Sequence, residues 1–220
     1  MILSDDKQIT IQNAFREIPQ EIKPKIKEIC LDMRRTYLSA IKNNLPEAKI
    51  VIDHFHLIQD ANRRITEERR ILQQVFKTKI PMRIFLRNKE NLDPKEKPKI
   101  NNYFKKYPDL KFYYEAKETL RDMYRLKNKE EAQQKLKIPI QALKLADDLG
   151  LRQWGKNLSY WQEYILNFFT RKTTNAYMEG LNTKFKLIKR ISFGFRNKEV
   201  FIRKAFLACL PLTLLPHLLT

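Results

Sequence analysis

Three acidic residues and a histidine have the types and places that metal-dependent phosphodiester chemistry requires. Asp32 and Asp53 each directly follow a short apolar run, His56 lies one helical turn after Asp53, and Glu179 lies in a distant amphipathic stretch. Carboxylate oxygens are the ligands that hard divalent cations prefer. Two such ions can activate a water or a 3′-hydroxyl on one side of a phosphodiester and stabilise the leaving oxygen on the other.

A β-α-β unit is predicted to position the two aspartates. Residues 26–31 and 49–52 are apolar runs of strand length, and apolar residues recur at helical spacing between them. The crossover of such a unit is right-handed and its strands are parallel, so the residues just past both strands gather along one edge of the sheet. Asp32 and Asp53 are these residues.

Glu179 is predicted to lie on an amphipathic helix over residues 176–189. Thr173, Thr174 and Asn175 precede it as capping side chains. Its apolar stripe is Tyr177, Met178, Leu181, Phe185 and Ile188. The other face carries an acid, an amide and two bases in line, namely Glu179, Asn182, Lys186 and Lys189.

The region between these elements is predicted to be all helical. The chain has only four glycines, and helical periods alternate with prolines from about residue 57 to residue 157. We expect helices over 57–76 and 154–169 and a basic loop over 93–99. The apolar stripe of the 154–169 helix is expected to be ordinary core.

The net charge favours nucleic acid as the partner. A charge of +19 and a pI near 9.9 exceed what solubility requires and suit regularly spaced phosphates. A surface that is simply rich in lysine is the alternative. Phosphate contacts are expected from the bases that follow Glu179, above all Lys186, Lys189, Arg190 and Arg196.

Several other classes of protein are disfavoured. Cys30 and Cys209 are isolated among apolar neighbours, which is typical of small buried residues in a reducing cytoplasm. The apolar segment 205–219 is expected to be too short and too broken by proline to span a bilayer, and residues 1–6 do not show the basic and then apolar pattern expected of a secretory signal. The histidines and cysteines lack the paired spacing of a zinc site, and the glycines form no phosphate-binding loop.

The chain resembles the DDE-type transposases of the bacterial insertion-sequence group called ISL-three. The resemblance keeps its order across nearly the whole chain. Its first block includes Asp32, Tyr37, Leu45-Pro46 and Val51-Ile52-Asp53-His54-Phe55-His56. A second block is Phe85-Leu86-Arg87-Asn88 with Glu90-Asn91-Leu92, and the last runs from Thr174-Asn175-Ala176-Tyr177-Met178-Glu179-Gly180-Leu181-Asn182 to Gly194-Phe195-Arg196-Asn197.

The resemblance implies a mostly helical α/β fold, in which a ribonuclease-H-like core is interrupted by a large all-α insertion. Residues 1–57 would form the first part of an incomplete core, 58–172 the insertion, and 173–220 the core helices carrying the glutamate. It also implies that Asp32 is the second catalytic aspartate, Glu179 the catalytic glutamate, and Mg²⁺ the cofactor, with two ions in an intact enzyme. Asp53 and His56 match a supporting acid-x-x-His motif, and Asn182 lies in the glutamate's block.

Each assignment has a competing interpretation. Asp32 is also a suitable helix N-cap, Asp53 and His56 are also suited to a local hydrogen-bonded pair, and Glu179 to a solvated helix surface. Asp53 competes with Asp32 as the second catalytic acid. If Asp32 and Glu179 share a site, their carboxylates should lie within about 10 Å of each other.

The family's first aspartate has no convincing match in this sequence, so we expect an N-terminally truncated transposase that binds one ion or none and is inactive alone. It would act in the bacterial cytoplasm, at the nucleoid, with DNA and with a second copy or an intact transposase as partners. The alternative is a non-enzymatic remnant that only binds DNA or modulates intact transposase. A helical RNA-binding protein is a third interpretation.

Overall fold

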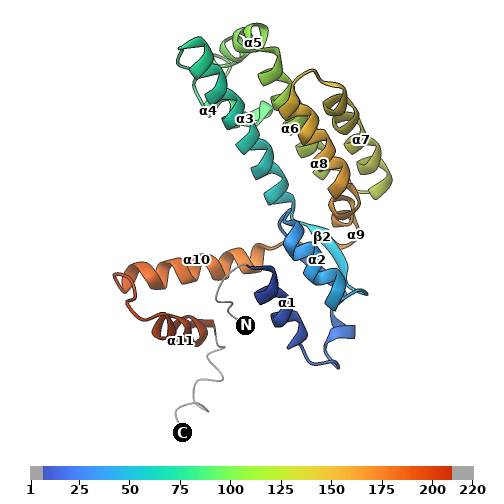
Figure 1. The fold of residues 1–220 in the computed structure, drawn as a ribbon. Coiled ribbons are helices and arrows are strands. Elements are labelled where there is room, and N and C mark those ends of the chain that lie inside the picture. Colours follow the sequence, from blue (N-terminus) through green and yellow to red (C-terminus); the bar gives the residue numbers. More distant parts are fainter. Residues whose placement is uncertain (1–6, 210–220) are drawn as a thin grey trace.

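The computed structural model describes residues 7–209, which form a mostly helical α/β structure (Figure 1). Strand β1 (Glu28–Leu31) and strand β2 (Lys49–Ile52) pair in parallel, and helix α2 (Arg35–Asn44) connects them. The predicted β-α-β unit is therefore confirmed. Strand β2 is buried over its last three residues, as expected for a strand covered by helices on its faces.

A short N-terminal region packs beside this unit. Helix α1 (Gln8–Arg16) contacts α2 and buries Ile11, and a 3-10 turn, η1 (Lys23–Lys25), leads into β1. Among residues 7–209 the sheet contains only β1 and β2. The apolar side chains of β1, α1 and α2 border a hollow of about 490 Å³ next to the end of β1.

Every regular element between β2 and residue 171 is helical, as the sequence predicted. The long helix α3 (His54–Phe76) leads away from the sheet and packs against α6 (Pro108–Tyr124). The short elements α4 (Arg83–Leu86), η2 (Lys89–Asn91) and α5 (Lys97–Lys106) lie at its far end (Figure 1). The block is completed by α7 (Lys129–Leu145), α8 (Leu149–Leu166) and α9 (Phe168–Arg171).

Some predicted boundaries were wrong, and capping residues explain two of them. Helix α3 begins three residues earlier than predicted because Asp53 caps it, and α8 begins at Leu149 because the Asp148 side chain accepts the Leu151 N–H. The predicted loop over 93–99 is shorter than expected, since α5 begins at Lys97 with a proline in its first turn.

The core is continuous from the sheet into the helical block. Trp154 is fully buried and stacks on Tyr113, with ring centroids 5.8 Å apart. Trp161, Ile165, Phe168 and Phe169 are also buried, which confirms that this stripe is core. The amide of buried Asn167 donates to the Ile50 carbonyl at 2.8 Å and so ties the end of α8 to β2.

Helices α10 (Ala176–Ile191) and α11 (Lys198–Cys209) form a hairpin that extends away from the rest of the structure (Figure 1). No residue of α10 is buried, although its apolar face is as predicted, and its main helical neighbour in the described chain is α11. Tyr177 is 76% exposed. The hairpin therefore presents one charged and one apolar face outside the core.

Two minor expectations have mixed outcomes. Cys30 and Cys209 are half-buried rather than fully buried. Of the apolar segment 205–219, residues 210–219 lie outside the described part of the chain. Within residues 7–209, no helix is long and apolar enough to cross a membrane.

Candidate metal centre

Asp53 links three elements at the edge of the sheet. It follows β2 directly and is 1% exposed. One carboxylate oxygen accepts the Phe55 N–H at 3.0 Å and caps α3, and the other accepts the Asn175 N–H at 3.0 Å. Asn175 is the N-cap residue of α10. A single buried carboxylate thus fixes the first turn of α3 and the start of α10 relative to β2.

This connection brings Glu179 to the sheet edge. Glu179 lies in the first turn of α10. One ligand atom each from Asp53, His56 and Glu179 lie within 4.8 Å of one another. Residues distant in sequence therefore form one cluster with two carboxylates and an imidazole.

Asp32 enters the cluster through His56. The His56 Nε2 atom lies 2.6 Å from an Asp32 oxygen, and its Nδ1 atom lies 3.2 Å from the Gln59 side-chain oxygen. Asp32 is not the cap of α2, since that helix begins at Arg35 and its N-cap is Arg34. The sequence also allowed Asp53 and His56 to form a hydrogen-bonded pair. In the structure the His56 ring contacts the side chains of Asp32 and Gln59 instead.

The segment between α9 and α10 is held by β1. Lys172 adopts a left-handed conformation with φ of 55°, which turns the chain after α9. The Thr173 hydroxyl donates to a carboxylate oxygen of Glu28, and the Cys30 thiol donates to the Thr173 carbonyl at 3.8 Å. Together with Asp53, these contacts fix the direction in which α10 leaves the core.

Negative charge at the sheet edge changes the acidity of its neighbours. Burial raises the pKa of the Cys30 thiol to about 12, with further contributions from Asp53, Asp32 and Glu28. Burial also raises the pKa of Tyr124, and Asp53 and Cys30 add to the effect. A bound cation would offset this accumulated negative charge. A thiol with so high a pKa is not a reactive nucleophile.

The donor set suits a hard divalent cation. Carboxylate oxygens suit Mg²⁺ and Mn²⁺, whereas imidazole is more typical of softer metals. The Oδ1 atom of Asp53 accepts the Phe55 N–H and lies 3.2 Å from the His54 Nδ1 atom, whereas within residues 7–209 its Oδ2 atom accepts only the Asn175 N–H. Since a carboxylate oxygen has two lone pairs, Oδ2 has room for a metal. Asp53 and Glu179 would hold the ion, while His56 keeps its contact with Asp32.

An open hollow adjoins the cluster. It measures about 540 Å³ and is bordered by Asp32, His56 and polar side chains of the first turns of α3, including Asn62 and Arg63. The Asp32 side chain is 38% exposed, in contrast to buried Asp53. Asp32 therefore faces the side of the cluster that a large substrate can reach.

The residues predicted to support the site and contact DNA lie on the surface of the hairpin. Asn182, Lys186, Lys189 and Arg190 are exposed on α10, and Arg196 is exposed in the turn before α11. Two neighbouring lysines serve the hairpin itself. Lys184 donates to the Ala208 carbonyl, and the Lys204 ammonium lies 5.3 Å from the Phe195 ring centroid.

Sequence reasoning named the acids and the histidine of the cluster, and which aspartate is the second catalytic acid stays a prediction. It ranked Asp32 above Asp53 as the partner of Glu179, whereas the metal-compatible group contains Asp53. The contact between Asp32 and His56 was missed. The two histidines that follow β2 were the available signal, because a residue in the first turn of α3 lies at the same sheet edge as Asp32.

The family model of ISL-three-group DDE transposases, described as "Transposase", matches residues 1–205. The transposase for insertion sequence element IS1001 of Bordetella parapertussis is 25% identical over 209 residues, which cover 90% of this chain and 52% of that protein. The chain thus spans about half the length of this relative. No solved structure matches it. Because the family model covers nearly the whole chain, the protein belongs to the ISL-three group of insertion-sequence transposases.

Proposed function

We propose that the chain contributes the second and third acids of a transposase site that cleaves and joins DNA with two divalent ions. The observation that supports this most strongly is the meeting of Asp53, His56 and Glu179 at one sheet edge. Membership in the family supports the interpretation of this cluster as a metal site, since DDE enzymes use acids to hold metal ions beside a phosphodiester.

Within this proposal the acids have different roles. Asp53 and Glu179 would hold one ion. Asp32 is the catalytic acid on the open side, where the hollow admits DNA, and His56 keeps its carboxylate oriented until metal and substrate arrive. When bound, Mg²⁺ would supply Lewis-acid activation of the attacking oxygen and stabilise the leaving oxygen.

The domain organisation follows from the same proposal. The β-α-β unit within residues 1–57 and the helices of 173–220 would belong to a ribonuclease-H-like core, and residues 58–172 would be its helical insertion. The direction of α10, fixed by Asp53 and β1, supports this division, because the glutamate helix returns to the sheet after the insertion.

DNA is the proposed substrate, held through its phosphates by Lys186, Lys189, Arg190 and Arg196. Such a protein would work in the bacterial cytoplasm, at the nucleoid. Binding should be largely independent of sequence and should weaken steeply with salt, because phosphate contacts release counterions. An affinity that stays constant between low and physiological ionic strength would contradict this part of the proposal.

Metal binding tests the site directly. Titration of the protein with Mn²⁺, followed by electron paramagnetic resonance of the free ion, should reveal binding. Glu179→Gln should weaken this binding by about tenfold or more, since a carboxylate that contacts the ion directly is lost. Glu199→Gln is the matched control, because Glu199 is an acid in the first turn of the neighbouring helix α11. Equal Mn²⁺ affinity in Glu179→Gln and the wild type would show that the cluster is not the metal site.

A non-enzymatic role in DNA binding is the second candidate. It is favoured by the state of Asp53, whose oxygens both accept main-chain hydrogen bonds and whose side chain is buried. If this carboxylate is purely structural, the described acids would be too few for two ions. Mn²⁺ binding that is unchanged in Asp53→Asn but lost in Glu179→Gln would favour this candidate.

A further inference from the structure

A second hollow lies far from the metal centre. It measures about 580 Å³ and lies between α6 and the segment that contains η2 and α5. Figure 1 places these elements at the end of α3 opposite the sheet. It is lined by Leu92, from the block Glu90-Asn91-Leu92, and by Lys89 just before that block, and the proposed chemistry does not use these residues. The hollow therefore needs its own explanation.

A buried lysine holds the segment that precedes Lys89 against α6. Lys117 of α6 is fully buried, and its ammonium donates to the Phe85 carbonyl at 3.1 Å and to the Arg87 carbonyl at 2.8 Å. Its charge is balanced by Glu118, 2.9 Å away. Burying a lysine is costly unless it is paired and hydrogen-bonded, so these contacts lock residues 85–87 onto α6.

Two further contacts fix the edge of the hollow. Glu118 accepts the Lys89 N–H at 3.1 Å, and Arg121 forms an ion pair of 2.7 Å with Glu90. The hydrogen bond from Arg121 is the main reason why the pKa of Glu90 is lowered to about 2. The main chain of η2 is thus tied to α6, and the hollow has a defined shape before any ligand binds.

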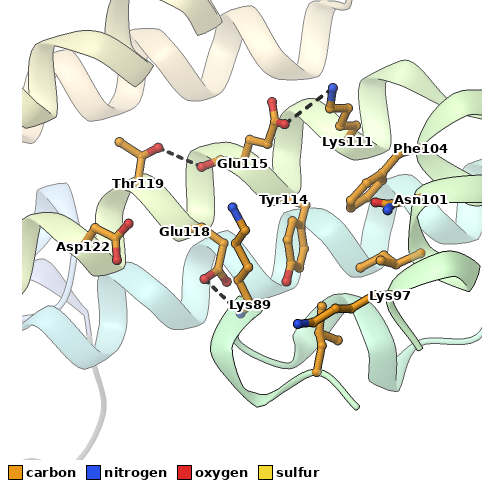
Figure 2. Close-up of a pocket in the computed structure, with 12 residues that line it drawn as sticks. Lys89, Lys97, Asn101, Phe104, Lys111, Tyr114, Glu115, Glu118, Thr119 and Asp122 are labelled. Carbon is orange, nitrogen blue, oxygen red and sulfur yellow. Dashed lines mark hydrogen bonds and ion pairs between the residues drawn. The ribbon is translucent and has the colours of Figure 1, made fainter. Parts of the chain in front are cut away.

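The lining combines apolar surface with charges of both signs. Its three acids, Glu115, Glu118 and Asp122, are each paired with a base, whereas two of its lysines are not. Leu92, Ile100 and the ring of Phe104 form its apolar part. Lys89 and Lys97 both line the hollow (Figure 2), and among residues 7–209 neither ammonium forms an ion pair. Lys111, by contrast, lies 3.6 Å from Glu115.

We propose that this hollow binds one unpaired nucleotide of a DNA strand, an inference that rests on the proposed function. The base would lie against Phe104 and the apolar lining, and Lys89 and Lys97 would contact its phosphate. Aromatic side chains stack on any base, and lysines contribute sequence-independent phosphate contacts. The Asn101 amide, which also lines the hollow, offers a donor and an acceptor for a base edge.

The surroundings favour a nucleotide within a strand over a free nucleotide. Further exposed lysines lie in the same segment of the chain, at positions 95, 99 and 105. A free nucleotide would not reach them, whereas a strand that passes over the hollow would place successive phosphates beside them. The strand would thereby be held at a second place, remote from the metal centre.

The test uses the full chain without metal and a DNA duplex with a single-stranded tail that carries 2-aminopurine. Binding should change the fluorescence of a tail probe and leave a probe in the paired region unchanged. Lys89→Gln/Lys97→Gln should weaken binding of the tailed DNA by about tenfold, with at most a twofold effect on blunt duplex. Phe104→Leu should abolish the fluorescence change while keeping most of the apolar volume.

Lys127→Gln/Lys156→Gln is the charge-matched control, since both lysines are exposed and lie outside the hollow. It should bind the tailed DNA like the wild type, and circular dichroism should show that all variants are folded. An unchanged probe signal in Lys89→Gln/Lys97→Gln and in Phe104→Leu would overturn the inference.

Competition separates the two sources of a nucleoside phosphate. Free ATP should not remove the probe signal at concentrations that leave overall DNA binding unchanged. If it does, the hollow binds a free nucleotide and not a nucleotide within a DNA strand, and the inference fails. Binding without any preference for a tail would overturn this inference alone. Mn²⁺ binding that is unchanged in Glu179→Gln would contradict the proposed function and would leave the inference about the hollow untouched.

Discussion

At the scale of single residues, the two aspartates at the sheet edge differ in burial and in hydrogen-bond partners. Asp53 is buried and bound by main-chain N–H groups, whereas Asp32 is partly exposed and paired with His56. Sequence identified both because each follows an apolar run. Which of them is the second catalytic acid stays a prediction. Their different burial and main-chain partners could not be predicted, because these depend on where α10 begins, which a local pattern does not reveal.

Glu68 gives a pH-dependent prediction at this scale. It is 9% exposed on α3, and burial, with contributions from Asp148 and Asp109, raises its pKa to about 7. Arg64, also on α3, and Tyr113 of α6 are charged or titratable groups of the same cluster. The folded state therefore holds a proton on Glu68 that the unfolded state releases near pH 4.5.

Because the folded pKa of Glu68 is raised, its contribution to the free energy of unfolding is fully present below about pH 4.5 and declines as the pH rises to about 7. Glu68→Gln should remove this decline, so the variant should gain on the order of 1–3 kcal/mol relative to the wild type between pH 5 and pH 8. Urea unfolding at several pH values measures the difference. A difference that is constant with pH would show that Glu68 is ionised normally.

At the scale of elements, the α7–α8 pair depends on a close approach at Gly155. A Cβ atom there would lie 2.9 Å from the Leu143 Cβ and 2.9 Å from the Lys144 main-chain nitrogen. Gly155→Ala should therefore destabilise the protein by about 1–3 kcal/mol, because the helices must separate. Thermal unfolding measures this.

Gly180 is the matched control for this prediction. It also lies inside a helix, α10, but a Cβ there would meet no atom within 4 Å. Gly180→Ala should leave stability unchanged or raise it by roughly 0.5–1 kcal/mol, through the better helix propensity of alanine. Equal destabilisation by both substitutions would show that helix propensity, and not the α7–α8 contact, controls the effect.

Most elements were predictable because their signals are local. The apolar runs predicted the two strands, and the low glycine content with helical periods predicted the helical block. The break between α8 and α9 was not predicted, since the residues around Asn167 contain no proline or glycine. Its cause is tertiary, because the Asn167 amide bonds to the Ile50 carbonyl of β2 and directs the chain around the sheet.

At the scale of the whole molecule, the hairpin of α10 and α11 meets the core mainly at the sheet edge. Periodicity predicted the apolar face of α10 correctly but did not reveal that it lies outside the core. A helix pattern shows which residues share a face, while the partner of that face depends on the direction in which the chain leaves the preceding element. Here Lys172, Thr173 and Asp53 set that direction.

This arrangement predicts that metal binding stiffens the junction. A divalent ion between Asp53 and Glu179 would join the core to the hairpin, in addition to the hydrogen bond at Asn175. Trypsin should cut the exposed bond after Arg171 or Lys172 about tenfold more slowly in the presence of Mn²⁺, in line with ligand stabilisation of the closed state.

The control for the protease measurement is the pair of acid variants. Glu199→Gln should keep the protection by Mn²⁺, whereas Glu179→Gln should lose it. Cleavage within the helical block serves as an internal reference, because its rate should not depend on Mn²⁺. Protection that persists in Glu179→Gln would mean that the ion binds elsewhere.

The final prediction concerns activity of the chain by itself. The family resemblance implies a first aspartate on a separate strand, and the sheet of residues 7–209 contains only β1 and β2, which are followed by Asp32 and Asp53. Two-metal chemistry depends on accurate placement of both ions, so a missing ligand should cost most of the rate. We expect no nicking of insertion-sequence-end DNA by the 220-residue chain with Mg²⁺ or Mn²⁺.

A longer chain that supplies the family's first aspartate provides the comparison. It should nick the same DNA, and replacement of that aspartate, of Asp32 or of Glu179 by alanine should abolish the activity. If the 220-residue chain nicks DNA alone and Asp53→Ala abolishes this while folding is retained, Asp53 is the third metal ligand. The buried carboxylate would then hold the metal ion while it still accepts the Asn175 N–H, so the start of α10 would stay fixed during catalysis.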